Sequence, residues 1–434
     1  MPTAGQGNHH DCRRAVRNDI VNRETQVLKT DAVTVEAEAA EAPPQPQRQL
    51  LALTGNEAVA EAIRQIDPHV CAAYPITPTT QIMQEVAQFI ADGRMRAELV
   101  PCESEHSAMS ACVGAGAAGA RVMTATSANG LALMWEVLYI ASGMRLPIVM
   151  AVGNRALSGP LNIHCDHSDS MGARDSGWIQ FYAESVQEAY DNILQAVRIG
   201  EHPDVLLPVM CCMDGFLTTH TSENAEILDD AEVRDFLGKY RARYSLLDVD
   251  NPVTFGATDL PNAYTEHKYQ QVEAMKKADA VIRAVCVEFG AKFGREHGML
   301  EAYCMEDADT AIVVLSSTAG SVADMVDTLR AEGRKVGLLR PRVFRPFPAA
   351  DVRAALQDLT AVTVLDRSHS FGADGGPLFT EVRAALFDAP HRPRVLGRVY
   401  GLGGRAITGG EIRALYDEIE TDTAPTFRFV GVRE

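Results

Sequence analysis

The chain has 434 residues, 46% of them hydrophobic and 23% charged, a composition typical of a globular protein with two or three full-sized cores. Its net charge of −18 argues against binding to nucleic acid, to an anionic membrane or to another strongly acidic protein, and no apolar run reaches the ~18 residues of a membrane span. The nine scattered cysteines form no C-x-x-C pair, which disfavours an iron–sulfur motif and a disulfide framework and favours a reducing, cytoplasmic location.

Residues 1–48 show no periodic apolar face and end in a run rich in Ala, Glu, Pro and Gln, so we expect a disordered tail. From residue 49 to 225, short apolar runs alternate with helical stretches. The first helix begins at Glu57, with Asn56 as its expected cap. The remaining predicted strands are 70–74, 98–101, 122–126, 147–152 and 205–213, and the helices are 80–91, 104–112, 131–142 and 186–199. This alternation predicts a parallel sheet covered on both faces.

Residues 226–305 interrupt the alternation. They are polar and contain one long predicted helix over 265–293, so we interpret them as a helical connector. In 306–434 the predicted strands are 311–316, 335–339, 361–365 and 395–400, and the helices are 321–331, 349–356, 378–386 and 411–419, the last with a capping box at Thr408-x-x-Glu411. The fold class is therefore α/β, with two doubly wound parallel-sheet domains at 49–225 and 306–434.

Two glycine patterns resemble dinucleotide fingerprints. Gly114-x-Gly116-x-x-Gly119 matches the letters, but a helix precedes it and a strand follows, the reverse of the order that phosphate binding requires. We expect close packing of a helix end there. Gly401-x-Gly403-x-x-Ala406 does follow a strand, but too little chain remains for the rest of a nicotinamide site, so a turn is expected.

The segment His164-Cys165-Asp166-His167, with Asp169 after it, is dense in possible metal ligands. Neighbouring residues point apart, whereas a closed zinc site needs ligands spread over turns. We predict no metal site, and interpret the segment as a polar loop near a ligand or a subunit contact.

Three places carry candidate functional residues. In Tyr74–Pro78 an apolar strand is stopped by two prolines around the hydroxyl of Thr77. Glu103 and Glu105 start a helix, where acids offset the macrodipole, but the small and apolar residues that follow leave no solvated face. One of these acids is therefore expected in a buried or interfacial position. Arg155 follows a strand at the carboxyl edge of the sheet, where it either binds a carboxylate through two parallel hydrogen bonds or is a plain surface arginine.

At these residues the chain resembles the α subunit of 2-oxoacid:ferredoxin oxidoreductases, most closely the pyruvate type. The similarity runs in order from about residue 50 to about residue 420. It is carried by residues 74–78, 103–106, 126–130, 154–158, 166–169, 174–178, 213–216, 339–341, 344–347, 365–367 and 400–405. The resemblance implies that a thiamine-diphosphate pyrimidine-binding module comes first and a transketolase C-terminal-like domain second.

The resemblance also implies roles for single residues. Glu105 would be the catalytic acid that hydrogen-bonds the pyrimidine N1′ of thiamine diphosphate, with Pro75 and Ile76 as further cofactor contacts. Thr77 and Arg155 would bind the substrate. The implied reaction is the reversible oxidative decarboxylation of pyruvate with coenzyme A to acetyl-CoA and CO2, with the electrons passed to ferredoxin.

The chain lacks the Gly-Asp-Gly…Asn pattern that holds Mg²⁺ and the diphosphate, and it lacks cluster-binding cysteines. The resemblance assigns the diphosphate and Mg²⁺ to a β subunit, and the [4Fe-4S] clusters to γ and δ subunits or fusions. The active site would then lie at a subunit interface, with the small residues 114–120 permitting close packing. Ferredoxin would dock on another subunit, since this chain is acidic.

Several alternatives stay open. The order Asn154-Arg155-Ala156-Leu157 favours pyruvate, then a branched-chain 2-oxoacid, because the 2-oxoglutarate type tends to follow its arginine with Gly-Pro. A non-catalytic scaffold subunit is disfavoured by the trio of Thr77, Glu105 and Arg155. A nucleotide-binding Rossmann protein is disfavoured by the reversed glycine context.

Overall fold

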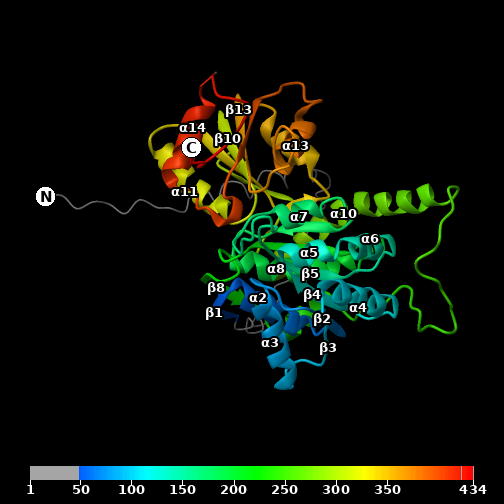
Figure 1. Cartoon of the computed structure of the whole chain (residues 1–434). Helices are drawn as coiled ribbons and strands as arrows, with labels where there is room; N and C mark the ends of the chain where they lie inside the picture. The colour runs from blue at the N-terminus through cyan, green and yellow to red at the C-terminus, as the bar shows by residue number, and fades with distance from the viewer. Residues whose placement is uncertain (1–47, 422, 434) are drawn as a thin grey trace, which may run out of the picture. The chain divides into compact units, whose positions relative to one another are not determined.

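The computed structural model describes residues 48–421 and 423–433, so the tail predicted over 1–48 lies, apart from Arg48, outside the described residues. The chain alternates strands and helices in two series that are separated by a mainly helical segment (Figure 1). The first series comprises β1 (Gln49–Thr54), α2 (Gly55–Ile66), β2 (Val70–Ala73), α3 (Thr80–Ala91), β3 (Glu98–Pro101), α4 (Glu105–Ala117), β4 (Val122–Thr126), α5 (Ala128–Leu133), α6 (Trp135–Gly143), β5 (Val149–Asn154), α7 (Ser168–Gly172), β6 (Ile179–Tyr182), α8 (Val186–Gly200), β7 (Val209–Asp214) and β8 (Ser222–Ile227).

Two helices, α9 (Asp230–Leu237) and α10 (Tyr264–Phe293), lead to the second series. The first ten residues of α10 are not buried, and its burial begins at Ala274, where it packs against α8. The second series comprises β9 (Leu300–Tyr303), β10 (Thr310–Val314), α11 (Thr318–Ala331), β11 (Val336–Pro341), β12 (Val343–Arg345), α12 (Ala349–Leu356), β13 (Ala361–Asp366), α13 (Pro377–Leu386), β14 (Arg394–Val399), a 3₁₀ turn (Leu402–Gly404), α14 (Gly409–Ile419) and β15 (Phe427–Phe429).

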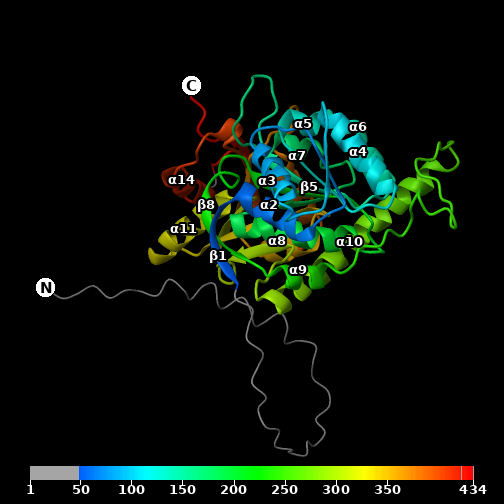
Figure 2. The same ribbon diagram turned by 90° about the horizontal axis from the view of Figure 1, so that it is seen from below.

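The first sheet has seven strands in the order β12-β6-β7-β5-β4-β2-β3. On one face α2 packs against both α3 and α8, and on the other face α4, α5 and α6 pack with one another (Figure 2). The chain passes from β2 to the edge strand β3 and then returns across β2 to β4, so the winding reverses between β2 and β4. In open α/β sheets the carboxyl ends of the strands at such a reversal form the ligand crevice.

The second sheet has six strands in the order β15-β14-β13-β10-β11-β9. The α/β class is confirmed, but the prediction of wholly parallel sheets is wrong at two edges. The edge strands β9 and β12 pair antiparallel with β11 and β6. An antiparallel ribbon of β1 and β8, also unpredicted, lies apart from both sheets. Strands β9 and β12 are only four and three residues long and β8 is polar, so neither length nor alternation marks them, and the apolar β1 has its pairing partner far along the chain.

The predicted cap of the first helix is also wrong. Thr54, not Asn56, is the N-cap: its hydroxyl accepts from the Glu57 amide at 3.3 Å, and the Glu57 carboxylate accepts from the Thr54 amide at 2.7 Å. Asn56 is buried and its side-chain amide donates to the Pro78 carbonyl at 2.8 Å. The helix predicted over 131–142 is two helices, α5 and α6, that break at Met134.

The second series is joined to the first sheet by more than the connector. Strand β12 completes the first sheet beside β6, and Arg340 on β11 donates two hydrogen bonds, of 2.9 and 3.0 Å, to Glu188 on α8. Burial by itself would raise the pKa of Glu188, but the guanidinium groups of Arg340 and Arg342 outweigh it and lower the pKa to about 2. This ion pair therefore persists at any ordinary pH.

Two further features bear on the sequence predictions. The eight cysteines among the described residues are all free, and seven of them are buried. Over the part of the chain that the structure describes, we find no helix with the length and apolarity that crossing a bilayer requires.

Candidate active site

The predicted site residues gather at one edge of the first sheet. Strands β2, β4, β5 and β7 are parallel, and β4, β5 and β7 are consecutive neighbours beside β2. Their carboxyl ends therefore open on the same side, at the reversal described above. The segments that follow them carry Thr77, residues 127–130 at the start of α5, Arg155 and Gly215, while Glu105 enters from the start of α4.

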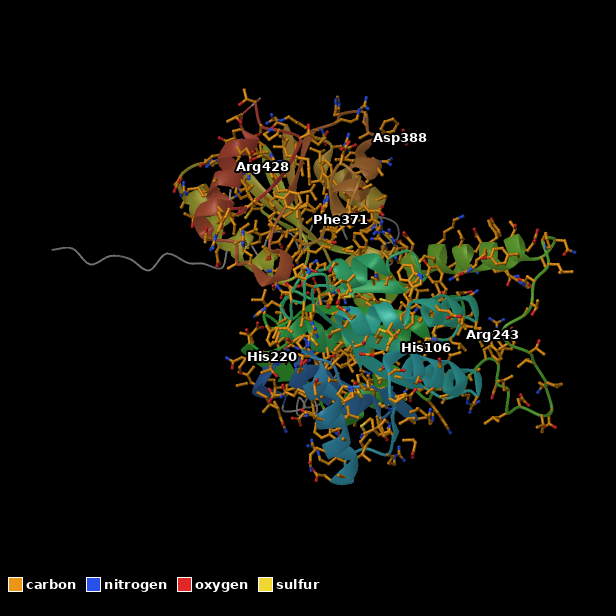
Figure 3. All side chains as sticks on the ribbon, in the orientation of Figure 1. His106, His220, Arg243, Phe371, Asp388 and Arg428 are labelled. Atoms are coloured by element: carbon orange, nitrogen blue, oxygen red, sulfur yellow. The ribbon has the colours of Figure 1, made fainter. Side chains whose placement is uncertain are left out.

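Glu105 is the first residue of α4, and Ser104 before it is the N-cap, with its hydroxyl accepting from the Ser107 amide at 3.2 Å. The Glu105 side chain is only 6% exposed, and no group of the described residues donates a hydrogen bond to its carboxylate. The neighbouring acid and base differ: Glu103 is solvent-exposed and accepts from the Ser107 hydroxyl, and His106 is exposed near Glu136 (Figure 3). Glu105 is thus the acid that the fold buries, as predicted.

The place of Glu105 depends on a glycine in the first turn of α5, the helix that follows β4. A Cβ added to Gly130 would lie 2.6 Å from Glu105 Oε1 and 2.6 Å from Thr126 Oγ1. The carboxylate therefore rests on a position that only glycine leaves open. The Thr126 hydroxyl is fully buried and has no hydrogen-bond partner among the described residues. A buried acid and a buried hydroxyl with unused hydrogen-bonding capacity thus meet at one point, which suits a polar ligand.

Thr77 and Arg155, to which the resemblance assigns a substrate role, are in contact. Arg155 is 9% exposed, and its Nη1 donates to the Thr77 carbonyl at 2.8 Å. The contact uses the main chain of Thr77, whose side chain is exposed. Arg155 Nε donates to the Asn162 carbonyl at 3.2 Å, whereas Nη2 makes no hydrogen bond within the described residues. The guanidinium is therefore held from one side and still has a free donor edge.

The other two predicted cofactor contacts, Pro75 and Ile76, lie in the turn between β2 and α3. Pro75 is exposed and Ile76 is half-buried. The Ile76 carbonyl accepts from the Thr79 amide at 2.9 Å and from the Thr79 hydroxyl at 3.1 Å, and the same hydroxyl lies 3.2 Å from that of Ser127. The turn after β2 is in this way tied to the turn after β4.

The carboxylate of Asp169, for which no role was predicted from the sequence, connects the residues after β4 with those after β5. Asp169 Oδ2 accepts from the amides of Ala128 (2.9 Å) and Arg155 (3.0 Å), and Oδ1 accepts from the Asn154 side chain (2.8 Å) and the Ser170 amide (2.7 Å). Burial raises the pKa of Asp169 to about 6, against the effect of these four donors. Asp169 thus fixes the start of α5, at Ala128, relative to the main chain at Arg155. The one sequence signal for this role is that Asp169 lies in 166–169, a segment that carries the family resemblance.

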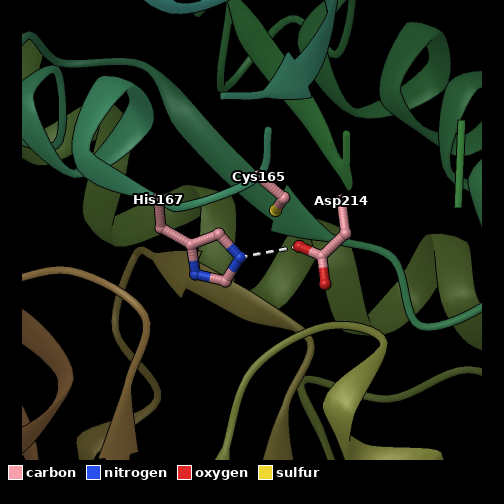
Figure 4. A group of neighbouring side chains, drawn as sticks. All are labelled: Cys165, His167 and Asp214. Atoms are coloured by element: carbon pink, nitrogen blue, oxygen red, sulfur yellow. Dashed lines mark hydrogen bonds and ion pairs between the residues drawn. The ribbon is translucent and has the colours of Figure 1, made fainter. Parts of the chain in front are cut away.

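A second buried cluster consists of Cys165, His167 and Asp214. His167 Nε2 and Asp214 Oδ1 are 2.7 Å apart (Figure 4). The Cys165 sulfur, a His167 ring nitrogen and an Asp214 carboxylate oxygen all lie within 4.8 Å of one another. Asp214 Oδ2 also accepts from Ser317 Oγ (2.5 Å) and Arg367 Nη1 (2.8 Å), both from the second series. Burial would raise the pKa of Asp214, but the charges of Arg367 and His167 outweigh it and hold the pKa well below its usual range.

This cluster has the ligand types of a metal site but not its charge balance. The Arg367 guanidinium already occupies one oxygen of Asp214 and lies 3.7 Å from the Cys165 sulfur. A cation there would face that positive charge, so the contacts favour a structural ion pair between the two series. His164 is exposed, away from the buried His167. The prediction that this segment holds no metal stays a prediction.

The glycine patterns have the contexts that the sequence predicts. Gly114 and Gly116 lie within α4, and Gly119 ends it with φ +92°, next to Ser245 of the connector segment. Gly401–Ala406 contains the 3₁₀ turn after β14. The first pattern has the reverse of the strand–loop–helix order of a phosphate site, and the second lies between β14 and α14, near the end of the chain. The geometry instead defines an α/β protein whose ligand edge offers one open buried carboxylate and one arginine with a free donor edge.

Comparison with known proteins identifies the family. Residues 61–286 match the model for pyruvate flavodoxin/ferredoxin oxidoreductase, thiamine diphosphate-binding, and residues 308–412 match the model for pyruvate:ferredoxin oxidoreductase core domain II. The chain is 53% identical over 386 residues to pyruvate synthase subunit PorA of Thermotoga maritima, covering 88% of this chain and 98% of that protein. The chain therefore belongs to the pyruvate:ferredoxin oxidoreductase family, whose members are oxidoreductase subunits.

Two further relatives are similar over most of their length. Pyruvate synthase subunit PorA of Methanocaldococcus jannaschii is 48% identical, with 88% of this chain and 98% of that protein covered, and ketoisovalerate oxidoreductase subunit VorA of Pyrococcus horikoshii is 43% identical, with 85% and 93% covered. Among solved structures, 2-oxoglutarate:ferredoxin oxidoreductase from Magnetococcus marinus, with 2-oxoglutarate, coenzyme A and succinyl-CoA bound, matches at a TM-score of 0.66 and 23% identity, covering 87% of this chain and 67% of that one. That likeness supports the fold.

Proposed function

We propose that this chain is the α subunit of a multisubunit pyruvate:ferredoxin oxidoreductase, which converts pyruvate and coenzyme A to acetyl-CoA and CO2 and passes two electrons to ferredoxin, reversibly. The observation that carries the proposal is the open carboxylate of Glu105 on the same sheet edge as the Arg155–Thr77 pair. A scaffold subunit has no use for a buried acid whose carboxylate receives no hydrogen bond from the described residues.

The residues at Glu105 fit thiamine diphosphate. A carboxylate without a protein partner suits a protonated ring nitrogen, and the unpartnered Thr126 hydroxyl and the bare Gly130 leave room beside it. Glu105 would hold the N1′ of the pyrimidine, with Pro75 and Ile76 alongside. When bound, thiamine diphosphate supplies the carbon nucleophile that adds to a 2-oxo group. The part of this chain is to hold a proton at N1′ and to keep the ring in one orientation.

The substrate carboxylate would bind at Arg155. Its free donor edge, fixed through Thr77 and Asn162, offers a charge-assisted hydrogen bond to a carboxylate, and the exposed Thr77 side chain adds a hydroxyl donor. Holding the carboxylate by a buried guanidinium orients the 2-oxo carbon before the reaction begins. A branched-chain 2-oxoacid is the second candidate, because a ketoisovalerate oxidoreductase subunit is 43% identical to this chain.

The proposal includes partners. The sequence has neither the Mg²⁺–diphosphate pattern nor cluster-binding cysteine runs. A β subunit would supply the diphosphate and Mg²⁺ site, and γ and δ subunits or fusions would supply [4Fe-4S] clusters and the contact to ferredoxin. The eight free cysteines of the described residues agree with a cytoplasmic location.

Purification of the tagged chain from its host tests this proposal. We expect a thiamine-binding chain and a cluster-bearing chain to co-purify with it, and the complex to reduce ferredoxin with pyruvate and coenzyme A. Isothermal titration of the isolated chain with thiamine diphosphate and Mg²⁺ should show weak or no binding. Tight binding by the isolated chain would exclude a divided cofactor site.

A further inference from the structure

The side chain of Arg155 is connected to the second series through one residue. Arg155 Nε donates to the Asn162 carbonyl at 3.2 Å, and the Asn162 side-chain amide donates to the Gly403 carbonyl at 3.0 Å. Gly403 belongs to the turn after β14, 241 positions along the chain from Asn162. A buried guanidinium of the first sheet is thus held by a loop that the second sheet supports.

Both ends of the Asn162 amide are occupied. Its Oδ1 accepts from the His164 amide at 2.7 Å while Nδ2 bonds Gly403. The Gly403 amide in turn donates to Asp166 Oδ2 at 3.2 Å, so both main-chain groups of Gly403 are used by this loop. A side-chain amide whose oxygen and nitrogen both have hydrogen-bond partners has one orientation. This fixes the backbone of Asn162, and with it the direction of the main-chain carbonyl that accepts from Arg155.

The turn is shaped for this contact. Gly403 has φ +62°, and a Cβ on it would lie 2.4 Å from Asn162 Nδ2, so any side chain would displace the amide. The residues on either side of Asn162 are different: Leu161 is 75% exposed and Ile163 is 43% exposed. Within this stretch, Asn162 alone links Arg155 to the turn.

We propose that Asn162 is a positioning residue for Arg155, and that the Leu402–Gly404 turn thereby contributes to binding of the 2-oxoacid carboxylate. The inference rests on the proposed function, in which Arg155 binds that carboxylate. Asn162 touches no reacting atom. Its carbonyl sets the plane of the guanidinium and so the direction of the free donor edge, on which a charged hydrogen bond depends.

A double-mutant cycle in the assembled oxidoreductase tests the inference, with KM and kcat measured for pyruvate. Asn162→Ala should raise KM about tenfold with kcat changed less than about twofold, since the lost interaction is present equally before and during the reaction. Arg155→Ala should raise KM further. In the double variant, Asn162→Ala should add nothing to Arg155→Ala, because the two act through one group. Independent, multiplying effects would overturn the inference.

Three controls make the outcome unambiguous. Leu161→Ala changes the same loop without touching the contact and should leave KM as it is. Gly403→Ala attacks the contact from the second sheet and should raise KM like Asn162→Ala, also without effect in the Arg155→Ala background; it replaces Asn162→Ala if that variant fails to assemble. An unchanged KM in Arg155→Ala would reject the proposed function. A raised KM in Arg155→Ala with none in Asn162→Ala or Gly403→Ala would reject only this inference.

Discussion

Two buried acids lie at helix N-termini, one on the carboxyl edge of each sheet, and they differ in their hydrogen-bond partners. Glu105 begins α4, rests on Gly130, and receives no hydrogen bond from the described residues. Asp366 ends β13 and rests on Gly376, where a Cβ would lie 2.2 Å from its carboxyl carbon. It accepts from the amides of Leu378 (2.8 Å) and Phe379 (2.9 Å) at the start of α13.

The difference lies in what completes each carboxylate. The carboxylate of Asp366 is completed by two amides of α13, so its hydrogen bonds hold the start of that helix against the sheet. Glu105 is left open, so it contributes little to the fold and is available to a ligand. Burial and position at a helix start, which both acids share, therefore do not identify a functional acid. Unused hydrogen-bonding capacity does.

The strongest way to break this comparison is Glu105→Gln. If the open acid serves catalysis, turnover and exchange of the thiazolium C2 proton should fall by about 10²-fold or more, because the amide does not hold the N1′ proton. Assembly and melting temperature should stay unchanged. The matched control is Glu103→Gln, two residues earlier and exposed, which should keep full activity. Persistent C2 exchange in Glu105→Gln would show that Glu105 has another role.

A smaller effect is expected from Gly130→Ala. The new methyl group would collide with Glu105 Oε1 and Thr126 Oγ1, both 2.6 Å from the added Cβ, and push the carboxylate out of place. We expect kcat to fall by about 10- to 100-fold, the usual cost of a displacement near 1 Å. Gly143→Ala, at the end of α6 with no atom within 4 Å of the added Cβ, is the control and should be active. Steady-state kinetics on both variants decides the point.

Asp366→Ala should have the reverse phenotype. The amides of Leu378 and Phe379 would lose their acceptor, which lowers the free energy of unfolding by about 1–3 kcal/mol. The assembled enzyme should keep its kcat within about twofold. Denaturant unfolding and kinetics on the same preparation measure both quantities. A loss of kcat without a loss of stability would mean that Asp366, too, is functional.

The pH dependence of stability gives the smallest and most specific test. Burial raises the pKa of Asp366 to about 7, so between the unfolded-state value near 4 and this value the folded state holds a proton that the unfolded state has lost. Its contribution is complete below pH ~4 and is lost as the pH rises through about 7. The wild-type melting temperature should therefore fall more steeply from pH 5 to pH 8 than that of Asp366→Ala. Equal slopes would place the titration elsewhere.

Much of the fold follows from the sequence. The helices 80–91 and 349–356 and the strands 98–101 and 122–126 have the predicted bounds, because each is a clear periodic or apolar run between Gly, Pro or polar breaks. The edge strands and the β1–β8 ribbon do not follow, since their pairing depends on partners far along the chain. The Thr54-x-x-Glu57 capping box has the same signature as Thr408-x-x-Glu411 and could have been recognised.

The site divides in the same way. Residue types and their places at the ends of strands and helices single out Thr77, Arg155 and the pair Glu103 and Glu105, and the family resemblance selects Glu105 from that pair. The fold brings Thr77 and Arg155 into contact. The use of the Thr77 carbonyl, and the roles of Gly130 and Asp169 in fixing these residues, depend on distances between loops. No spacing within one segment encodes such distances.

Strand β12 has a consequence for how the gene can be divided. Val343–Arg345 comes from the second series but completes the first sheet, with Val343 and Phe344 fully buried. A fragment that stopped at residue 305 would leave β6 as a bare edge, a template for pairing between copies. Expression of residues 49–305 alone should therefore give aggregates, and a division between the two series should keep residues 343–345 with the N-terminal piece.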